Sequence, residues 1–97
     1  MSTTHNKMRP QIEAPVKRDQ AEMVLAFYGR RLAEALARRP GCRDDAERMV
    51  VQMEVANHSA HLRTSIETCR VLKVRQGLLT WQVPANITQL LEIAGRA

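Results

Sequence analysis

Two segments in which apolar and polar residues alternate flank a helical segment, and this order constrains the fold more than any other feature. Asn57–Arg70 has the pattern of an amphipathic helix, because apolar residues such as Leu62 and Ile66 recur at spacings of three and four. Met49–Val55 precedes this segment and Leu78–Val83 follows it, and both alternate in polarity as half-buried β-strands do. The first prediction is therefore strand–helix–strand.

Two further helices are predicted from start and stop patterns. Asp19 and Glu22 have the spacing of a capping box, and the helix behind them should end near Arg39, before Pro40. Pro84 suits the first turn of the last helix. The apolar residues of that helix keep helical spacing to the end of the chain: Ile87, Leu90, Leu91 and Ala94.

The order of these elements predicts an α/β fold. Ile12–Val16 alternates in polarity and supplies a short first strand, so strand and helix follow one another three times. Such alternation indicates a small domain with a short mixed sheet, about three helices and right-handed crossovers. Residues 1–10 are polar and without periodicity, so we expect a flexible tail there and a single domain over residues 11–97.

One long helix over residues 44–76 is the alternative. Wound as a helix, this segment has two apolar faces, one of which contains Met49, Met53, Ala56 and Ala60. A small monomer cannot easily bury both faces, whereas a strand over Met49–Val55 has a single apolar face. The strand is therefore preferred. The alternative fold is an all-α, basic helical hairpin that forms a homodimer through the second apolar face.

Composition limits the functional classes. The chain has 97 residues, a net charge of +5, two cysteines and three aromatic residues. No apolar run is long enough to span a membrane, no secretory signal is recognisable, and two cysteines are no disulfide framework, so we expect a cytoplasmic protein. The positive residues are spread along the chain without interleaved aromatics, which makes nucleic acid a less favoured partner than protein.

Several stretches resemble the STAS domain, a bacterial family of anti-sigma-factor antagonists and accessory subunits of a lipid-asymmetry ABC transporter. Ser59-Ala60-His61-Leu62 is similar to the opening of its second helix. Val83–Ile87 with Leu90–Gly95 is similar to its last turn and terminal helix, and Asp19–Glu22 with Leu32–Leu36 to its first helix. The resemblance implies a STAS-like fold and a non-catalytic regulatory or accessory module that binds an ATPase, a kinase-like protein or a transporter subunit.

The resemblance also indicates a site. It implies that Ser59 opens a helix at the partner surface and that a partner kinase can phosphorylate its hydroxyl, which adds negative charge. The predicted partner-binding residues are Ser59, His58, His61, Leu62 and Arg63. As an alternative role, Ser59 is only the N-cap of its helix.

The remaining candidate residues favour structural roles. His58 and His61 lack a second ligand pair at metal-binding spacing, so no metal is predicted. Cys69 is expected in the core, Cys42 in a loop, and Trp81 under a helix. No catalytic constellation can be assembled, so we predict neither an enzyme nor a cofactor. The second functional class is a small basic helical regulator that binds nucleic acid.

Overall fold

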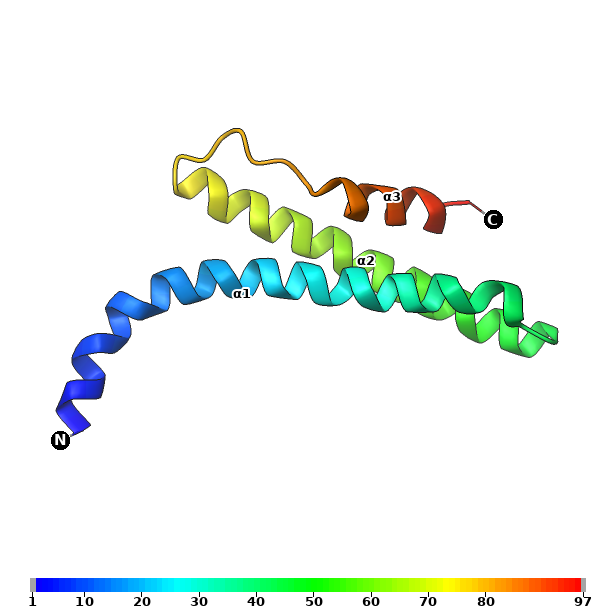
Figure 1. The fold of residues 1–97 in the computed structure, drawn as a ribbon, viewed down its shortest axis with the longest axis horizontal. Helices are drawn as coiled ribbons and strands as arrows, with labels where there is room; N and C mark the ends of the chain where they lie inside the picture. The colour runs from blue at the N-terminus through cyan, green and yellow to red at the C-terminus, as the bar shows by residue number, and fades with distance from the viewer. Residues whose placement is uncertain (1, 97) are drawn as a thin grey trace.

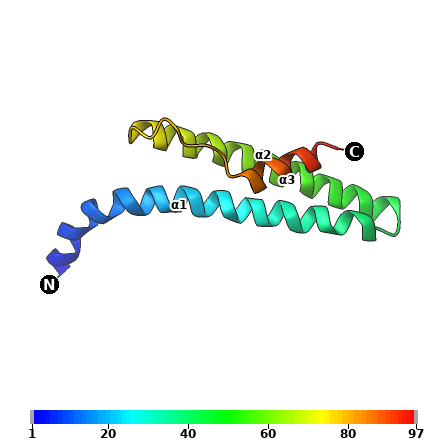
Figure 2. The same ribbon diagram turned by 45° about the horizontal axis from the view of Figure 1, so that its top comes forward.

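The chain folds into a helical hairpin with a third helix beside it (Figures 1 and 2). The computed structural model describes the backbone of residues 2–96 and the side chains of residues 20–96. The elements are α1 (Ser2–Arg38), the short 3-10 turn η1 (Arg39–Gly41), α2 (Asp45–Arg75) and α3 (Ala85–Ala94). Figure 1 shows α1 and α2 running antiparallel, with α3 along one side of the pair.

The α/β prediction is wrong, because residues 2–96 contain helices and no strand. The all-α helical hairpin that was kept as the alternative describes the fold. A STAS domain requires a mixed sheet, so the resemblance to that family is wrong as well. The roles of anti-sigma-factor antagonist and transporter accessory subunit lose the resemblance on which they rested.

The three segments predicted as strands have other structures. Ile12–Val16 belongs to α1, Met49–Val55 belongs to α2, and Leu78–Val83 forms the connection from α2 to α3. The capping box at Asp19 is also wrong, because α1 is already helical before that residue. The division into a tail and a domain stays a prediction.

Capping at its first turn explains where the long helix α2 begins. The Asp44 carboxylate accepts a hydrogen bond from the backbone N–H of Glu47 at 2.8 Å. The Glu47 carboxylate in turn accepts one from the backbone N–H of Arg43 at 2.7 Å. The bond to Asp44 satisfies one donor that a helix start leaves free and stabilises the start by about 1 kcal/mol. The bond from Arg43 fixes the residue that precedes the cap.

A glycine ends α2. Gly77 has a φ of 79°, the left-handed conformation that glycine adopts without strain. Its N–H donates to the carbonyl of Val74 at 2.9 Å, and the N–H of Leu78 donates to that of Lys73 at 2.8 Å. These two bonds form a Schellman motif, which ends the helix at this glycine.

The core lies where α1 and α2 face each other. Its residues repeat at spacings of three and four along both helices, as in an antiparallel coiled coil. Leu32 and Leu62 are fully buried, and Cys69 is buried beside them, as the sequence predicted. The buried apolar residues are Leu25, Leu32 and Ala35 from α1, Val51, Val55, Leu62, Ile66 and Cys69 from α2, and Ile87 from α3.

α3 docks against the hairpin at a position where α1 has no side chain. A Cβ atom on Gly29 would lie 2.7 Å from Cδ1 of Ile87, so glycine is what permits this approach. The other end of α3 is held by Arg39. Its guanidinium donates hydrogen bonds to the backbone carbonyls of Ile93, Ala94 and Arg96, which neutralises the carbonyl end of the helix.

Candidate functional site

The five predicted partner-binding residues do not form one surface. Ser59 and Leu62 are buried in the contact between α1 and α2. The His61 ring lies beside Tyr28, and His58 lies near Arg31 of α1. Arg63 borders the groove between α2 and α3. The five residues are close together in sequence, but the hairpin places them in three different environments.

Ser59 is a mid-helix residue, so the prediction that it caps a helix start is wrong; the N-cap of α2 is Asp44. Its side chain is 4% exposed, and its hydroxyl has no hydrogen-bond partner among the described residues. A kinase could reach this hydroxyl only if α1 and α2 separated. Phosphorylation of Ser59 and its contact with a partner stay predictions, and the burial of the hydroxyl disfavours both.

An aromatic cluster contains one of the two histidines, His61. The rings of Tyr28 and His61 are 4.8 Å apart between centroids, and those of Phe27 and Tyr28 are 5.2 Å apart in an edge-to-face arrangement. The Arg31 guanidinium lies 6.0 Å from the Phe27 ring. The sequence prediction missed this cluster. Phe27-Tyr28 next to Arg30-Arg31 was its only visible sign, because His61 joins it through the fold.

Positive charge and burial act together on His58. Burial lowers the pKa of its imidazole from the ordinary 6.5, and Arg31, His61 and Arg38 lower the pKa further. The Nδ1 atom is buried without a hydrogen-bond partner among residues 20–96. Arg38 forms an ion pair with Glu54 from α2. Burial and the nearby positive charges therefore favour the neutral form of the His58 ring.

Residues 20–96 bring together no group of three or more histidine, cysteine or acidic side chains that could hold a metal ion. Cys69 is buried, and burial raises the pKa of its thiol. Cys42 is half-buried near the hairpin turn, where its thiol contacts the carbonyl of Arg38 at 3.4 Å. That no metal, cofactor or reaction is involved stays a prediction.

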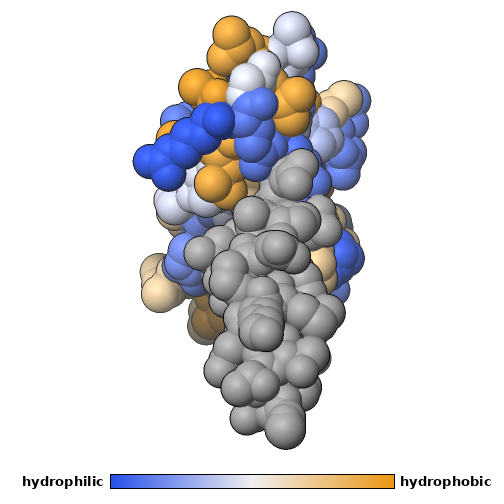
Figure 3. Space-filling view, turned by 90° about the vertical axis from the view of Figure 1, so that its left-hand side faces the viewer, coloured by the Kyte–Doolittle hydropathy of each residue, from blue (hydrophilic) through white to orange (hydrophobic). Residues whose placement is uncertain are grey.

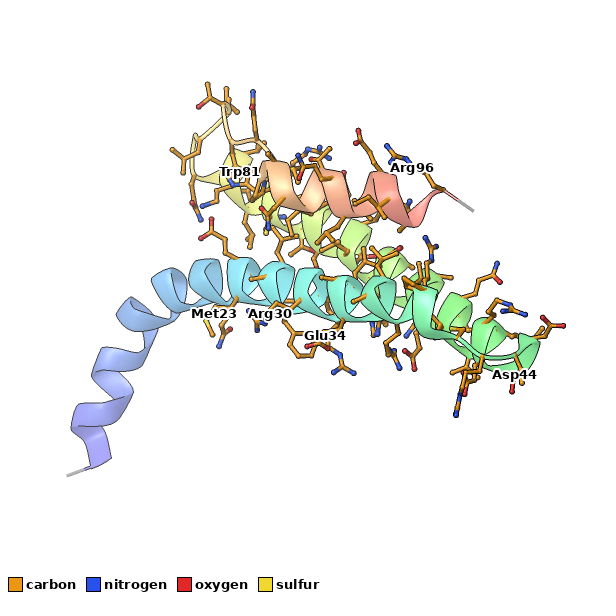
Figure 4. All side chains as sticks on the ribbon, turned by 45° about the vertical axis from the view of Figure 1, so that its right-hand side comes forward. Met23, Arg30, Glu34, Asp44, Trp81 and Arg96 are labelled. Carbon is orange, nitrogen blue, oxygen red and sulfur yellow. The ribbon has the colours of Figure 1, made fainter. Side chains whose placement is uncertain are left out.

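A groove between α1 and α3 is a concave surface of mixed polarity. Its cavity measures about 430 Å³ and has an apolar floor that includes Leu25 and Ile87. Trp81, Asn86 and Arg30 supply its polar and aromatic rim. In Figure 4, Trp81 lies in the connection just before α3. Trp81 is half-buried, partly as predicted for an aromatic under a helix.

Within residues 20–75, most cations of the hairpin are neutralised by a nearby carboxylate. The ion pairs are Arg31–Glu34, Arg38–Glu54, Arg43–Glu47, Arg48–Asp45, Arg70–Glu67 and Lys73–Glu22. The cations without a carboxylate partner among residues 20–96 are Arg30, Arg39, Arg63, Arg75 and Arg96.

Four of these five surround α3. Arg30 and Arg63 line the grooves on its two sides, Arg39 binds its carbonyl end, and Arg96 follows it (Figure 4). Glu92 is the one carboxylate that α3 itself carries. The unneutralised positive charge of the described residues is therefore concentrated on the face that carries α3, which we call the α3 face.

Apolar side chains are exposed at the end of the hairpin. Figure 3 shows them gathered around the connection that follows α2. Leu79 is 75% exposed, and Val71, Val74 and Leu78 are exposed nearby. Within residues 2–96, no helix combines the length and apolarity needed to cross a membrane, as the sequence predicted.

The chain was compared with family models, with curated proteins and with solved structures, and none of them matches it.

Proposed function

We propose that the chain is a small basic helical regulator that binds nucleic acid through its α3 face. The observation that carries the proposal is the position of the unpaired arginines. A cation already paired with a carboxylate adds little attraction for a phosphate, whereas an unpaired one releases condensed counterions when it binds. Arg30, Arg63 and Arg96 have no carboxylate partner among residues 20–96. Arg30 and Arg63 line the grooves beside α3, and Arg96 follows its end.

The composition of α3 supports the same surface. Its exposed side chains include Asn86, Thr88 and Gln89, which can hydrogen-bond to phosphate, sugar or base edges. α3 is short and rests on a rigid hairpin, an arrangement that can present one helix to a groove. The objection that the positive residues are spread along the sequence loses weight, because the fold gathers the unpaired ones. Binding to a protein partner instead stays a prediction.

Salt dependence tests the proposal. Binding of the full chain to a fluorescent DNA duplex, a single strand and an RNA hairpin should be followed by anisotropy over a range of salt concentrations. The variant Arg30→Gln/Arg96→Gln removes two unpaired cations, so the slope of log K against log salt should fall by about two.

The control Arg43→Gln/Arg48→Gln removes the same charge from cations that are paired with Glu47 and Asp45. It should leave the slope nearly unchanged. Equal losses in the two variants would show attraction by net charge alone, and absence of binding at low salt would refute a nucleic-acid partner.

A further inference from the structure

A second apolar stripe runs along α2 on the side opposite its core residues. We call it the outer stripe. Its members recur at spacings of three, four, three and four: Ala46, Met49, Met53, Ala56 and Ala60. All five are exposed, and Met49 and Met53 are 63% and 64% exposed. Such spacing is that of a coiled-coil seam, which one helix presents to another helix.

Charge is nearly absent around the outer stripe. Between Met49 and Leu62 the only charged residue is Glu54, and it is turned toward Arg38 of α1. Two chains of net charge +5 repel each other in general, so they can associate only where the local surface lacks positive charge. The outer stripe meets this requirement.

We propose that the outer stripe binds a second copy of this chain in an antiparallel dimer. A two-fold axis at the level of Glu54 sets Met49 of one copy opposite Ala60 of the other, and Met53 opposite Ala56. Each large side chain then meets a small one, so the two helices can approach closely and pack without voids. A parallel pair would instead place methionine against methionine and alanine against alanine.

The charges at the two ends of the outer stripe favour the same direction. At one end Asp45, whose side chain is 98% exposed, pairs with Arg48 of its own chain and can accept a second cation. At the other end Arg63 has no carboxylate partner among residues 20–96. Antiparallel copies bring Asp45 of each chain near Arg63 of the other. Parallel copies would bring like charges together.

The symmetry has a structural consequence. A two-fold axis that relates neighbouring antiparallel helices runs perpendicular to the plane that contains them, so both copies of α3 lie on the same side of the dimer. A parallel pair would place them on opposite sides. The dimer itself does not depend on the function proposed for the α3 face.

Sedimentation equilibrium of the full chain tests the dimer. Because the seam is short, we expect dissociation constants on the order of tens of micromolar. Met53→Glu puts a charge in the seam and should weaken dimerisation about tenfold or more. Met23→Glu is the matched control, since Met23 is 67% exposed on α1, away from α2 (Figure 4), and it should leave the dimer intact. A monomer at all concentrations, or equal effects of the two variants, overturns the proposal.

Disulfide trapping tests the direction. In a Cys42→Ser background, with Cys69 left in the core, the single variants Met49→Cys and Ala60→Cys are oxidised separately and as a mixture. Antiparallel pairing cross-links only the mixture, because like positions stand roughly 16 Å apart, beyond the reach of a disulfide. Cross-linking of each variant alone, without cross-linking between the two, would show parallel pairing and overturn the proposed register.

Discussion

The two apolar faces of α2 are similar in sequence and differ in what covers them. The inner face, with Val55 and Leu62, packs against α1 and is buried. The outer face, with Met49 and Met53, has the same helical spacing and is exposed. The comparison teaches that apolar periodicity identifies surfaces that gain from burial but does not identify what covers them.

The largest expected effect is a loss of stability on the inner face, and its absence would contradict the comparison between the two faces. Leu62 is fully buried, so Leu62→Ala should destabilise the chain by about 2–5 kcal/mol. Met53→Ala should change the stability of the monomer by less than about 0.5 kcal/mol, because Met53 is exposed. Urea unfolding at low protein concentration, followed by circular dichroism, measures both.

Protein concentration sharpens the same measurement. If the outer stripe binds a second copy, Met53→Ala should become destabilising relative to wild type as the concentration rises, because dimerisation stabilises the folded chain. Leu62→Ala should lower the free energy of unfolding of the monomer by the same amount at low and at high protein concentration. Similar costs for the two variants at low concentration would mean that the outer face is covered within the monomer.

The two faces of α2 also explain why the sequence predicted a strand. Val51 and Val55 belong to the inner face, and Met49 and Met53 belong to the outer face. Each pair has the i, i+4 spacing of a helix, and the two pairs are offset by two residues. Together they produce apolar residues at every second position, which is the pattern of a strand. Periodicity alone cannot separate these structures.

Other parts of the fold were accessible from sequence. The spacing of Ile87, Leu90 and Leu91 predicted the last helix. A small monomer cannot easily bury two faces of one helix, and α2 leaves one of its apolar faces exposed. The preference for a strand over Met49–Val55 was therefore wrong. Strong helix formers in α2 and the cap at Asp44 favoured the helix.

The candidate site could be predicted only in part, because its residues meet through the hairpin. His58 and Ser59 are neighbours in sequence, yet one lies near Arg31 of α1 and the other in the core. The approach of His61 to Tyr28 depends on the register between α1 and α2, which no local pattern fixes. The α3 face likewise depends on which arginines find carboxylates in the folded chain.

Ser59 provides a smaller effect, on the inner face. Because its buried hydroxyl has no partner, Ser59→Ala removes an unsatisfied polar group and adds a better helix former. We expect a gain of up to about 1 kcal/mol in the free energy of unfolding. Ala60→Ser, the matched change on the outer face, should cost at most about 0.5 kcal/mol. A clear loss of stability in Ser59→Ala would mean that the hydroxyl forms a hydrogen bond in the folded chain.

The smallest effect concerns His58, which lies at the edge between the two faces. Its pKa in the folded chain is lowered from 6.5, mainly by burial and then by Arg31. Between the lowered pKa and 6.5 the unfolded chain binds more protons than the folded chain, so the free energy of unfolding should rise with pH across that window. His58→Gln should flatten this rise.

The control for this pH dependence is His61→Gln. It removes only a lesser cause of the shift at His58, because burial and Arg31 remain, and the rise should persist. Urea unfolding at a series of pH values below 7 compares the three proteins. If His58→Gln keeps the full slope, the proton is taken up at another group. His58 would then be solvent-exposed and would not belong to the inner face of α2.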